Sequence, residues 1–154
     1  MAKIEISTAP QGSGTRYPPP HDAACRGREW RRLGDAAGLT QFGVNLMRLA
    51  PGVWSSQRHW HALEDEFVHV LEGELVLVTD QGEELMHAGD CAAFKAGDRN
   101  GHCLQNRSTA DATVLVVGSR IDDDYAEYSD LDMVSLPGRY TGRGGFRRRD
   151  GSEF

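Results

Sequence analysis

Three histidines and one glutamate have the residue types and the spacing needed to bind a divalent metal ion. They are His59, His61, Glu66 and His102. Successive side chains of a β-strand point to opposite faces, so His59 and His61 share one face with their Cα atoms ~6.8 Å apart. Two imidazoles at that separation can converge on one ion, and Trp60 between them must face the other way.

A short loop after this pair is expected to bring in the carboxylate. Residues 62–65 are predicted to form a hairpin loop, and the antiparallel return would place Glu66 beside His61. Further along the chain, the alternation that points His102 inward also points Asn106 inward. The sequence therefore predicts a mixed imidazole and carboxylate site for a single divalent cation.

The elements that must position these residues are short strands separated by turn signals. Between residues 29 and 120, β-like runs alternate with turns rich in Gly, Asp and Pro, and helical periodicity is almost absent. This spacing is typical of an all-β sandwich or barrel. Strands are expected at residues 30–33, 41–49, 55–61, 66–71, 74–79, 83–87, 91–95, 102–106 and 112–119, with a turn at 34–38.

The two ends of the chain have a different composition. Residues 1–28 are rich in Pro, Gly and Ser, so we expect an extended N-terminal arm. Residues 121–154 combine acidic residues, scattered aromatics and a basic tail, and are predicted to form a peripheral segment that wraps the barrel. The chain of 154 residues is long enough for one core, which would bury ~70% of the unfolded surface. One barrel domain, at residues 29–120, is expected between the two arms.

Two segments resemble the sequence motifs of the cupin superfamily. Residues 52–73 resemble the first motif, G-x5-H-x-H-x3,4-E-x6-G, with one extra residue before the first histidine. Residues 89–106 resemble the second motif, G-x5-P-x-G-x2-H-x3-N, with Lys95 in place of proline and two extra residues before the histidine. The resemblance implies a single-domain cupin β-barrel of the jelly-roll type. It also implies metal ligands at His59, His61, Glu66 and His102, and it places Asn106 at the closing asparagine.

The ligand set leaves both the metal and the reaction open. Three imidazoles and one carboxylate suit Fe(II), Mn(II), Co(II), Ni(II) or Zn(II), and spacing does not distinguish among them. Four protein ligands leave positions free for dioxygen or for a chelating substrate. This favours a dioxygenase, or an isomerase or lyase of a sugar or organic acid. The alternative is a non-catalytic cupin that binds a sugar or a carboxylate, because no acid–base residue is recognisable beside the metal.

Other residues are candidates for the substrate site. Gln57 is two residues from His59 and shares its face, so it could hydrogen-bond a ligand or a substrate. Arg48 and Lys95 are possible anchors for an anionic substrate. Tyrosines occur only in the arms, and a catalytic one would have to fold over the barrel mouth; the four are Tyr17, Tyr125, Tyr128 and Tyr140.

Composition excludes several classes of function. The formal net charge of -6 argues against nucleic-acid binding by the whole chain. No apolar run approaches the ~20 residues that a membrane helix needs, and the N-terminus lacks the pattern of a secretory signal. Three widely spaced cysteines predict reduced thiols, and with them a cytoplasmic protein.

Apolar side chains that point away from the barrel interior suggest a partner. A solvated sheet face usually carries fewer large apolar residues than are found here, namely Trp60, Phe67 and Leu71. We expect a homodimer formed by sheet-to-sheet packing, with the N-terminal arm contributing to the interface.

Overall fold

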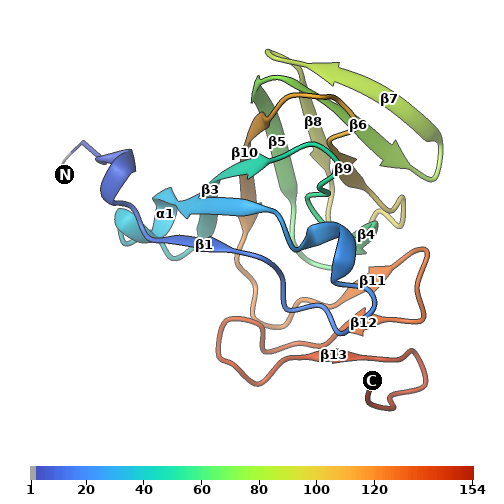
Figure 1. The fold of residues 1–154 in the computed structure, drawn as a ribbon. Coiled ribbons are helices and arrows are strands. Elements are labelled where there is room, and N and C mark those ends of the chain that lie inside the picture. The colour runs from blue at the N-terminus through green and yellow to red at the C-terminus, as the bar shows by residue number, and fades with distance from the viewer. Residues whose placement is uncertain (1–2) are drawn as a thin grey trace.

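Strands make up most of the ordered structure in the computed structural model, which describes residues 3–154 (Figure 1). This confirms the predicted all-β class. Helix is limited to one short turn of α-helix and two 3₁₀ turns, and no helix in the described part of the chain is long and apolar enough to span a membrane. The elements are η1 Ile6–Thr8, β1 Gln11–Ser13, η2 Ala23–Cys25, β2 Glu29–Arg32, α1 Leu33–Ala36, β3 Phe42–Leu49, β4 His59–His61, β5 Glu66–Glu72, β6 Glu74–Thr79, β7 Gly82–His87, β8 Cys91–Phe94, β9 Cys103–Gln105, β10 Ala112–Ser119, β11 Ala126–Tyr128, β12 Val134–Ser135 and β13 Phe146–Arg147.

The strands form three antiparallel sheets. A six-stranded sheet has the order β1-β2-β3-β10-β5-β8, a four-stranded sheet the order β13-β12-β11-β4, and a three-stranded sheet the order β7-β6-β9. Both arms take part, because β1 pairs with β2 and β11 pairs with β4. Strands β6 and β10 have the predicted bounds, whereas α1 overlaps the predicted turn at 34–38.

The predicted hairpin between the two ligand strands is wrong. Strand β4 pairs with β11, and β5 pairs with β10 and β8, so the two ligand strands belong to different sheets. The loop of residues 62–65 crosses between these sheets because its polar groups bond to distant segments. The Leu63 amide donates to Asp124, and the Asp65 carboxylate accepts from the Ala96 amide.

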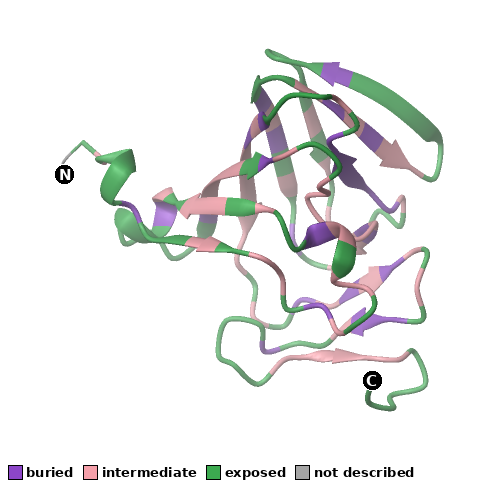
Figure 2. Cartoon of the chain, in the orientation of Figure 1, coloured by how far each residue is buried: buried purple, intermediate pink, exposed green. Residues whose placement is uncertain are grey.

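The main core lies between the six-stranded and three-stranded sheets. Along β5 and β6, buried residues alternate with more exposed ones, as expected for strands with one face on the core (Figure 2). Five core residues come from the larger sheet and four from the smaller one. They are Leu49, Val68, Val70, Ala112 and Val114, and Leu75, Leu77, Met86 and Leu104.

One fully buried polar residue, Asn106, links the end of β3 to the loop that precedes β10. Asn106 has no exposed surface, yet every polar atom of its side chain is paired. Its amide nitrogen donates to the carbonyls of Leu49 (2.7 Å) and Ala110 (2.8 Å). Its amide oxygen accepts from the backbone amide and the hydroxyl of Ser108. A buried amide is tolerated here because it replaces missing backbone pairs.

A second apolar cluster joins the two arms. It consists of Tyr17 and Cys25 from the N-terminal arm and Tyr128 and Met133 from the C-terminal segment, with Phe146 packed against it. The rings of Tyr17 and Tyr128 meet edge to face at a centroid distance of 5.4 Å. Tyr128 lies on β11, so this cluster holds β11 in place. Strand β11 in turn pairs with the ligand strand β4.

Candidate metal centre

The structure gathers three of the four predicted ligands tightly and places the fourth beside them. Donor atoms of His59, His61 and Glu66 lie within 4.8 Å of one another. The two Nε2 atoms of His59 and His61 are 3.1 Å apart. His102 precedes β9 and bridges to His59 through the backbone, and its Nε2 is 3.1 Å from Glu66 Oε2. Both strand histidines are at least nine-tenths buried.

Hydrogen bonds on the far side of each ring determine which nitrogens face the centre. His59 Nδ1 lies 2.9 Å from the Gln57 carbonyl oxygen, and His61 Nδ1 lies 2.6 Å from Asp124 Oδ2. Both partners are acceptors, so each Nδ1 carries a proton and each ring directs its Nε2 inward. Two Nε2 lone pairs 3.1 Å apart repel each other unless a shared proton or a metal cation lies between them.

This arrangement fits a metal ion. Two nitrogens bound to one ion at ~2.0–2.1 Å are ~3.0–3.4 Å apart, depending on coordination geometry, which matches the observed separation. Three imidazoles and a carboxylate form a suitable donor set for a divalent transition metal. Asp124 supplies the outer carboxylate that commonly orients a metal-bound histidine.

The charges of the cluster also suit a cation. Burial would raise the pKa of Glu66, but the hydrogen bond from His102 and the neighbouring imidazoles outweigh it and lower this pKa to about 2. Burial, together with the nearby rings of His61 and His102, lowers the pKa of His59 well below 6.5. A permanently ionised carboxylate therefore faces a neutral imidazole.

Aromatic rings and a glycine hold the ligands in place. Phe94 stacks on His102 with centroids 3.5 Å apart, and Tyr128 stacks on His59 at 5.5 Å. Next to His102, a Cβ at Gly101 would lie 1.9 Å from Ser129 Oγ. Only glycine therefore lets the C-terminal segment approach this closely.

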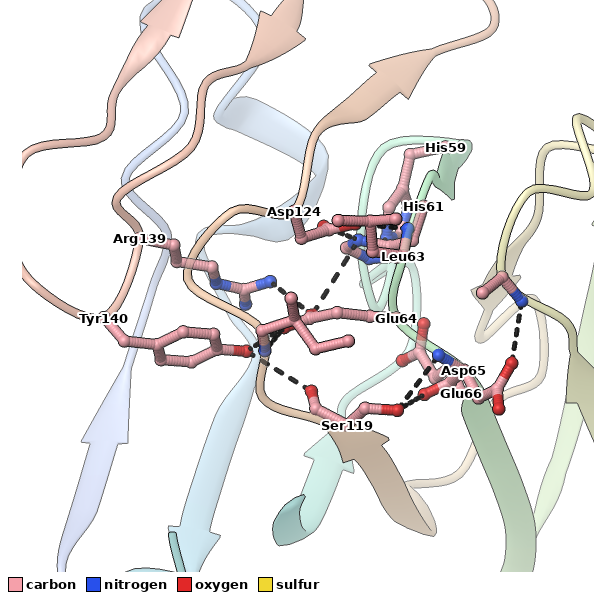
Figure 3. A network of polar contacts seen from close by, with 12 residues as sticks. His59, His61, Leu63, Glu64, Asp65, Glu66, Ser119, Asp124, Arg139 and Tyr140 are labelled. Atoms are coloured by element: carbon pink, nitrogen blue, oxygen red, sulfur yellow. Dashed lines mark hydrogen bonds and ion pairs between the residues drawn. The ribbon is translucent and has the colours of Figure 1, made fainter. Parts of the chain in front are cut away.

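A buried carboxylate that the sequence analysis missed lies behind His61. Glu64 is 5% exposed, and its Oε1 accepts from the Ile121 amide (2.7 Å) and the Tyr140 hydroxyl (2.8 Å). Its Oε2 lies 3.9 Å from both His61 Nδ1 and an Arg139 nitrogen (Figure 3). Asp124, Arg139 and Tyr140 thus join the site from the C-terminal segment.

The other predicted substrate residues do not enter the cluster. The Gln57 side chain donates to the His21 carbonyl, and only its backbone carbonyl contacts a ligand. Arg48 is exposed on the outer face of β3 and forms ion pairs with Glu29 and Asp111. Lys95 is exposed after β8 and lines a hollow of about 470 Å³, which Glu66 and Phe94 also line.

Comparisons with known proteins support the same fold. A family model described as a cupin domain matches residues 45–118. A crystal structure described as a sugar phosphate isomerase from the cupin superfamily, from Silicibacter pomeroyi, is 52% identical over 99% of this chain and 96% of its own, with a TM-score of 0.94. No curated protein matches.

Two further solved structures are more distant. One from Acidithiobacillus ferrooxidans, provisionally described as a sugar phosphate isomerase, is 28% identical over 83% of this chain and 80% of its own, with a TM-score of 0.74. One from Thermotoga maritima, described as a predicted oxalate decarboxylase, is 22% identical over 78% of this chain and 100% of its own, with a TM-score of 0.62. The latter is evidence for the fold alone.

Proposed function

The chain belongs to the cupin superfamily, and from this premise we propose that it is a metal-dependent isomerase acting on a phosphorylated sugar. The observation that carries the metal is the pair of inward Nε2 atoms, 3.1 Å apart, whose Nδ1 atoms are already bound. The similarity to a sugar phosphate isomerase over nearly the whole of both chains supports the substrate class.

The proposed metal would be held by His59, His61, Glu66 and His102. When bound, a divalent ion would polarise a carbonyl or hydroxyl of the sugar and so ease proton transfer between adjacent carbons. The identity of the ion stays open among Fe, Mn, Zn, Ni and Co, as the donor set accommodates each of them.

The chain's own residues would keep the site rigid and dry on two sides. Asp124 and the Gln57 carbonyl fix the tautomers and orientations of the two strand histidines. The rings of Phe94 and Tyr128 cover His102 and His59 and keep water from those flanks. Such preorganisation lets a bound sugar meet ligands that need no rearrangement.

The function is tested by incubating the metal-loaded protein with aldose and ketose phosphates in D₂O. Isomerisation would appear in NMR spectra as interconversion of the two sugars, and exchange of the proton on the carbon next to the carbonyl would accompany it. Loss of turnover after chelation and its return with metal would tie the reaction to the ion. Oxygen consumption would instead favour a dioxygenase, and binding without any turnover would favour a non-catalytic cupin.

Asp124→Asn tests how far the carboxylate behind His61 supports the metal. We expect metal affinity to fall about 10- to 100-fold, because an amide neither holds the Nδ1 proton as strongly nor adds negative charge behind the ligand. Competition with a fluorescent chelator measures the change. Asp123→Asn is the matched control. The Asp123 carboxylate is next to Asp124 in sequence but exposed, so its loss should leave the metal affinity unchanged. Equal affinities of the two variants would contradict the assigned role of Asp124.

The free cysteines support a reducing compartment, which we propose is the cytoplasm. Burial raises the pKa of the Cys25 and Cys103 thiols to about 11, and Cys91 is exposed. Persisting thiols of this kind are typical of cytoplasmic proteins.

We also propose a homodimer formed through the outer face of the six-stranded sheet. Phe42, Phe67 and Leu71 are each about 40% exposed there, and β1 of the N-terminal arm is an edge strand of this same sheet. Trp60, also expected at the interface, lies in the four-stranded sheet instead. It packs against Tyr125, with ring centroids 6.4 Å apart.

Phe67→Glu is expected to convert this dimer into a monomer at micromolar concentration. A carboxylate buried at an apolar interface costs several kcal/mol when it has no partner. Light scattering during size-exclusion chromatography gives the mass. Leu85→Glu is the control, because Leu85 is 51% exposed on β7 in another sheet. A monomeric wild type, or a dimeric Phe67→Glu variant, would show that this face is not the interface.

A further inference from the structure

The loop between β12 and β13 is anchored at a defined place beside the candidate metal centre. The Asp122 carboxylate accepts hydrogen bonds from the backbone amides of Tyr140 (3.0 Å) and Thr141 (3.1 Å), and from the Thr141 hydroxyl (2.8 Å). It also pairs with Arg143 at 3.0 Å. One carboxylate thus organises the loop, and the position of Arg139 within it follows.

The Arg139 side chain points from this loop toward Glu64 and His61 (Figure 3). Its closest carboxylate oxygen, on Glu64, is 3.9 Å away, which is too far for a hydrogen bond. Within residues 3–154 no acceptor takes a hydrogen bond from its guanidinium, although half of the side chain (49%) is exposed. By contrast, Arg143 and Arg120 nearby donate to carboxylates. The guanidinium of Arg139 therefore offers unused N–H donors.

The surroundings of Arg139 connect it to the ligands. Burial would lower its pKa, but the neighbouring Tyr140, Tyr128, Glu64 and Glu66 side chains outweigh this and raise it. Arg139 thus lies near the ligand cluster, on the Nδ1 side of His61, with the Glu64 carboxylate between the two side chains. Glu64 is buried, and its Oε1 is already engaged by Ile121 and Tyr140. The Glu64 carboxylate can therefore orient the Arg139 guanidinium by charge without accepting a hydrogen bond from it.

We propose that Arg139 binds the phosphate group of the substrate while the sugar's reacting end lies at the metal centre. A guanidinium presents paired N–H groups that match two phosphate oxygens, and it stays charged at any physiological pH. This inference rests on the proposed function and deepens it by assigning the substrate's phosphate to a residue. In a sugar phosphate, the phosphate is several bonds from the carbonyl. A sugar phosphate therefore requires a phosphate anchor that lies near the ligands without being one of them, as Arg139 does.

The competing explanation is that Arg139 only balances the charge of Glu64. The two roles differ in what they predict for ligands with and without phosphate. A structural ion pair would affect folding and leave phosphate recognition unchanged. If Arg139 is a phosphate anchor, its substitution would weaken the binding of phosphorylated ligands only. The loss would be smaller for lysine, which keeps the charge, than for glutamine.

The test measures binding of glycerol 1-phosphate and of glycerol to the protein by calorimetry, with metal and after chelation. For Arg139→Gln we expect the affinity for glycerol 1-phosphate to fall roughly 10- to 100-fold. Arg139→Lys, which keeps the charge and loses the fork, should lie between this variant and the wild type. Arg143→Gln is the matched control from the same loop, and its affinity should stay within about threefold of the wild type. Thermal melts establish that each variant is folded, and if Arg139→Gln is not, Arg139→Lys alone provides the comparison.

Several results would overturn the assignment. Unchanged affinity for glycerol 1-phosphate in both Arg139→Gln and Arg139→Lys is the first. Equal losses of affinity in Arg143→Gln and Arg139→Gln are the second, because they would show that the variants act by disturbing the loop. A wild type that prefers glycerol 1-phosphate no more than glycerol also contradicts it. Arg139-dependent phosphate binding without isomerisation would refute the proposed function alone. If the protein isomerises sugar phosphates and Arg139→Gln leaves the KM unchanged, only the phosphate site is refuted.

Discussion

His61→Ala is expected to abolish tight metal binding and, with it, the proposed isomerase activity. The imidazole of His61 supplies one of two inward Nε2 atoms, and it is the only ligand whose far nitrogen is held by a carboxylate, Asp124. Losing an outer partner alone weakens a metal site by about 10- to 100-fold, so losing the ligand itself should cost more than 100-fold. Elemental analysis of the purified protein, followed by titration with metal, measures the loss.

The control for this variant is His69→Ala. His69 lies on β5, three residues after Glu66, and it points away from the ligand cluster. Its removal should leave metal content and turnover at the wild-type level. Circular dichroism checks that both variants keep the fold. Full metal occupancy in His61→Ala would mean that the ion is held elsewhere, and the assignment of the whole cluster would then fail.

The largest expected effect on stability is that of Asn106→Ala, at about 3 kcal/mol of unfolding free energy. The side chain has no exposed surface and makes four hydrogen bonds. Alanine would leave the Leu49 and Ala110 carbonyls without these donors, deprive the Ser108 amide of its acceptor, and open a void. Buried groups that lose their partners each cost ~1–3 kcal/mol, and losses within one network exceed those of isolated bonds.

Urea unfolding followed by tryptophan fluorescence measures this loss. Asn100→Ala is the control, because Asn100 is partly exposed and its side chain accepts a single hydrogen bond, from the Asp80 amide. We expect that variant to lose no more than about 1 kcal/mol. A midpoint for Asn106→Ala equal to that of the control would show that this end of the barrel does not depend on the asparagine.

The strands were predictable where one face meets the core. Along β6 and β10 the alternation of side chains and the flanking turn residues are both local, so the sequence alone marks their bounds. The ligand residues were predictable for a similar reason, since their spacing is local to each motif. The pairing of β4 was not, because the loop of residues 62–65 is held by bonds to residues more than 50 positions away.

The outer residues of the site could not be predicted for the same reason. Asp124 belongs to an acidic run and Arg139 to a basic tail, compositions that usually indicate solvated surface. Nothing in the local pattern distinguishes Asp124 from its neighbour Asp123. Only the pairing of β11 with β4 brings Asp124 to His61 Nδ1. No strand is predicted within residues 121–154, so the position of Asp124 just before β11 gave no signal in the sequence.

The shared cluster of the two arms, built on Tyr17, Cys25, Tyr128 and Met133, ties both chain ends to the ligand strand. A chain trimmed to residues 45–118, the stretch common to cupin domains, would keep all four ligands. It would lose the residue that orients His61 and the ring that backs His59. Under the proposed function, the barrel would supply the ligands of the cation, and the two chain ends would adapt the site to a particular molecule. Changes in selectivity among such proteins can therefore arise far from the ligands in sequence, at the two ends.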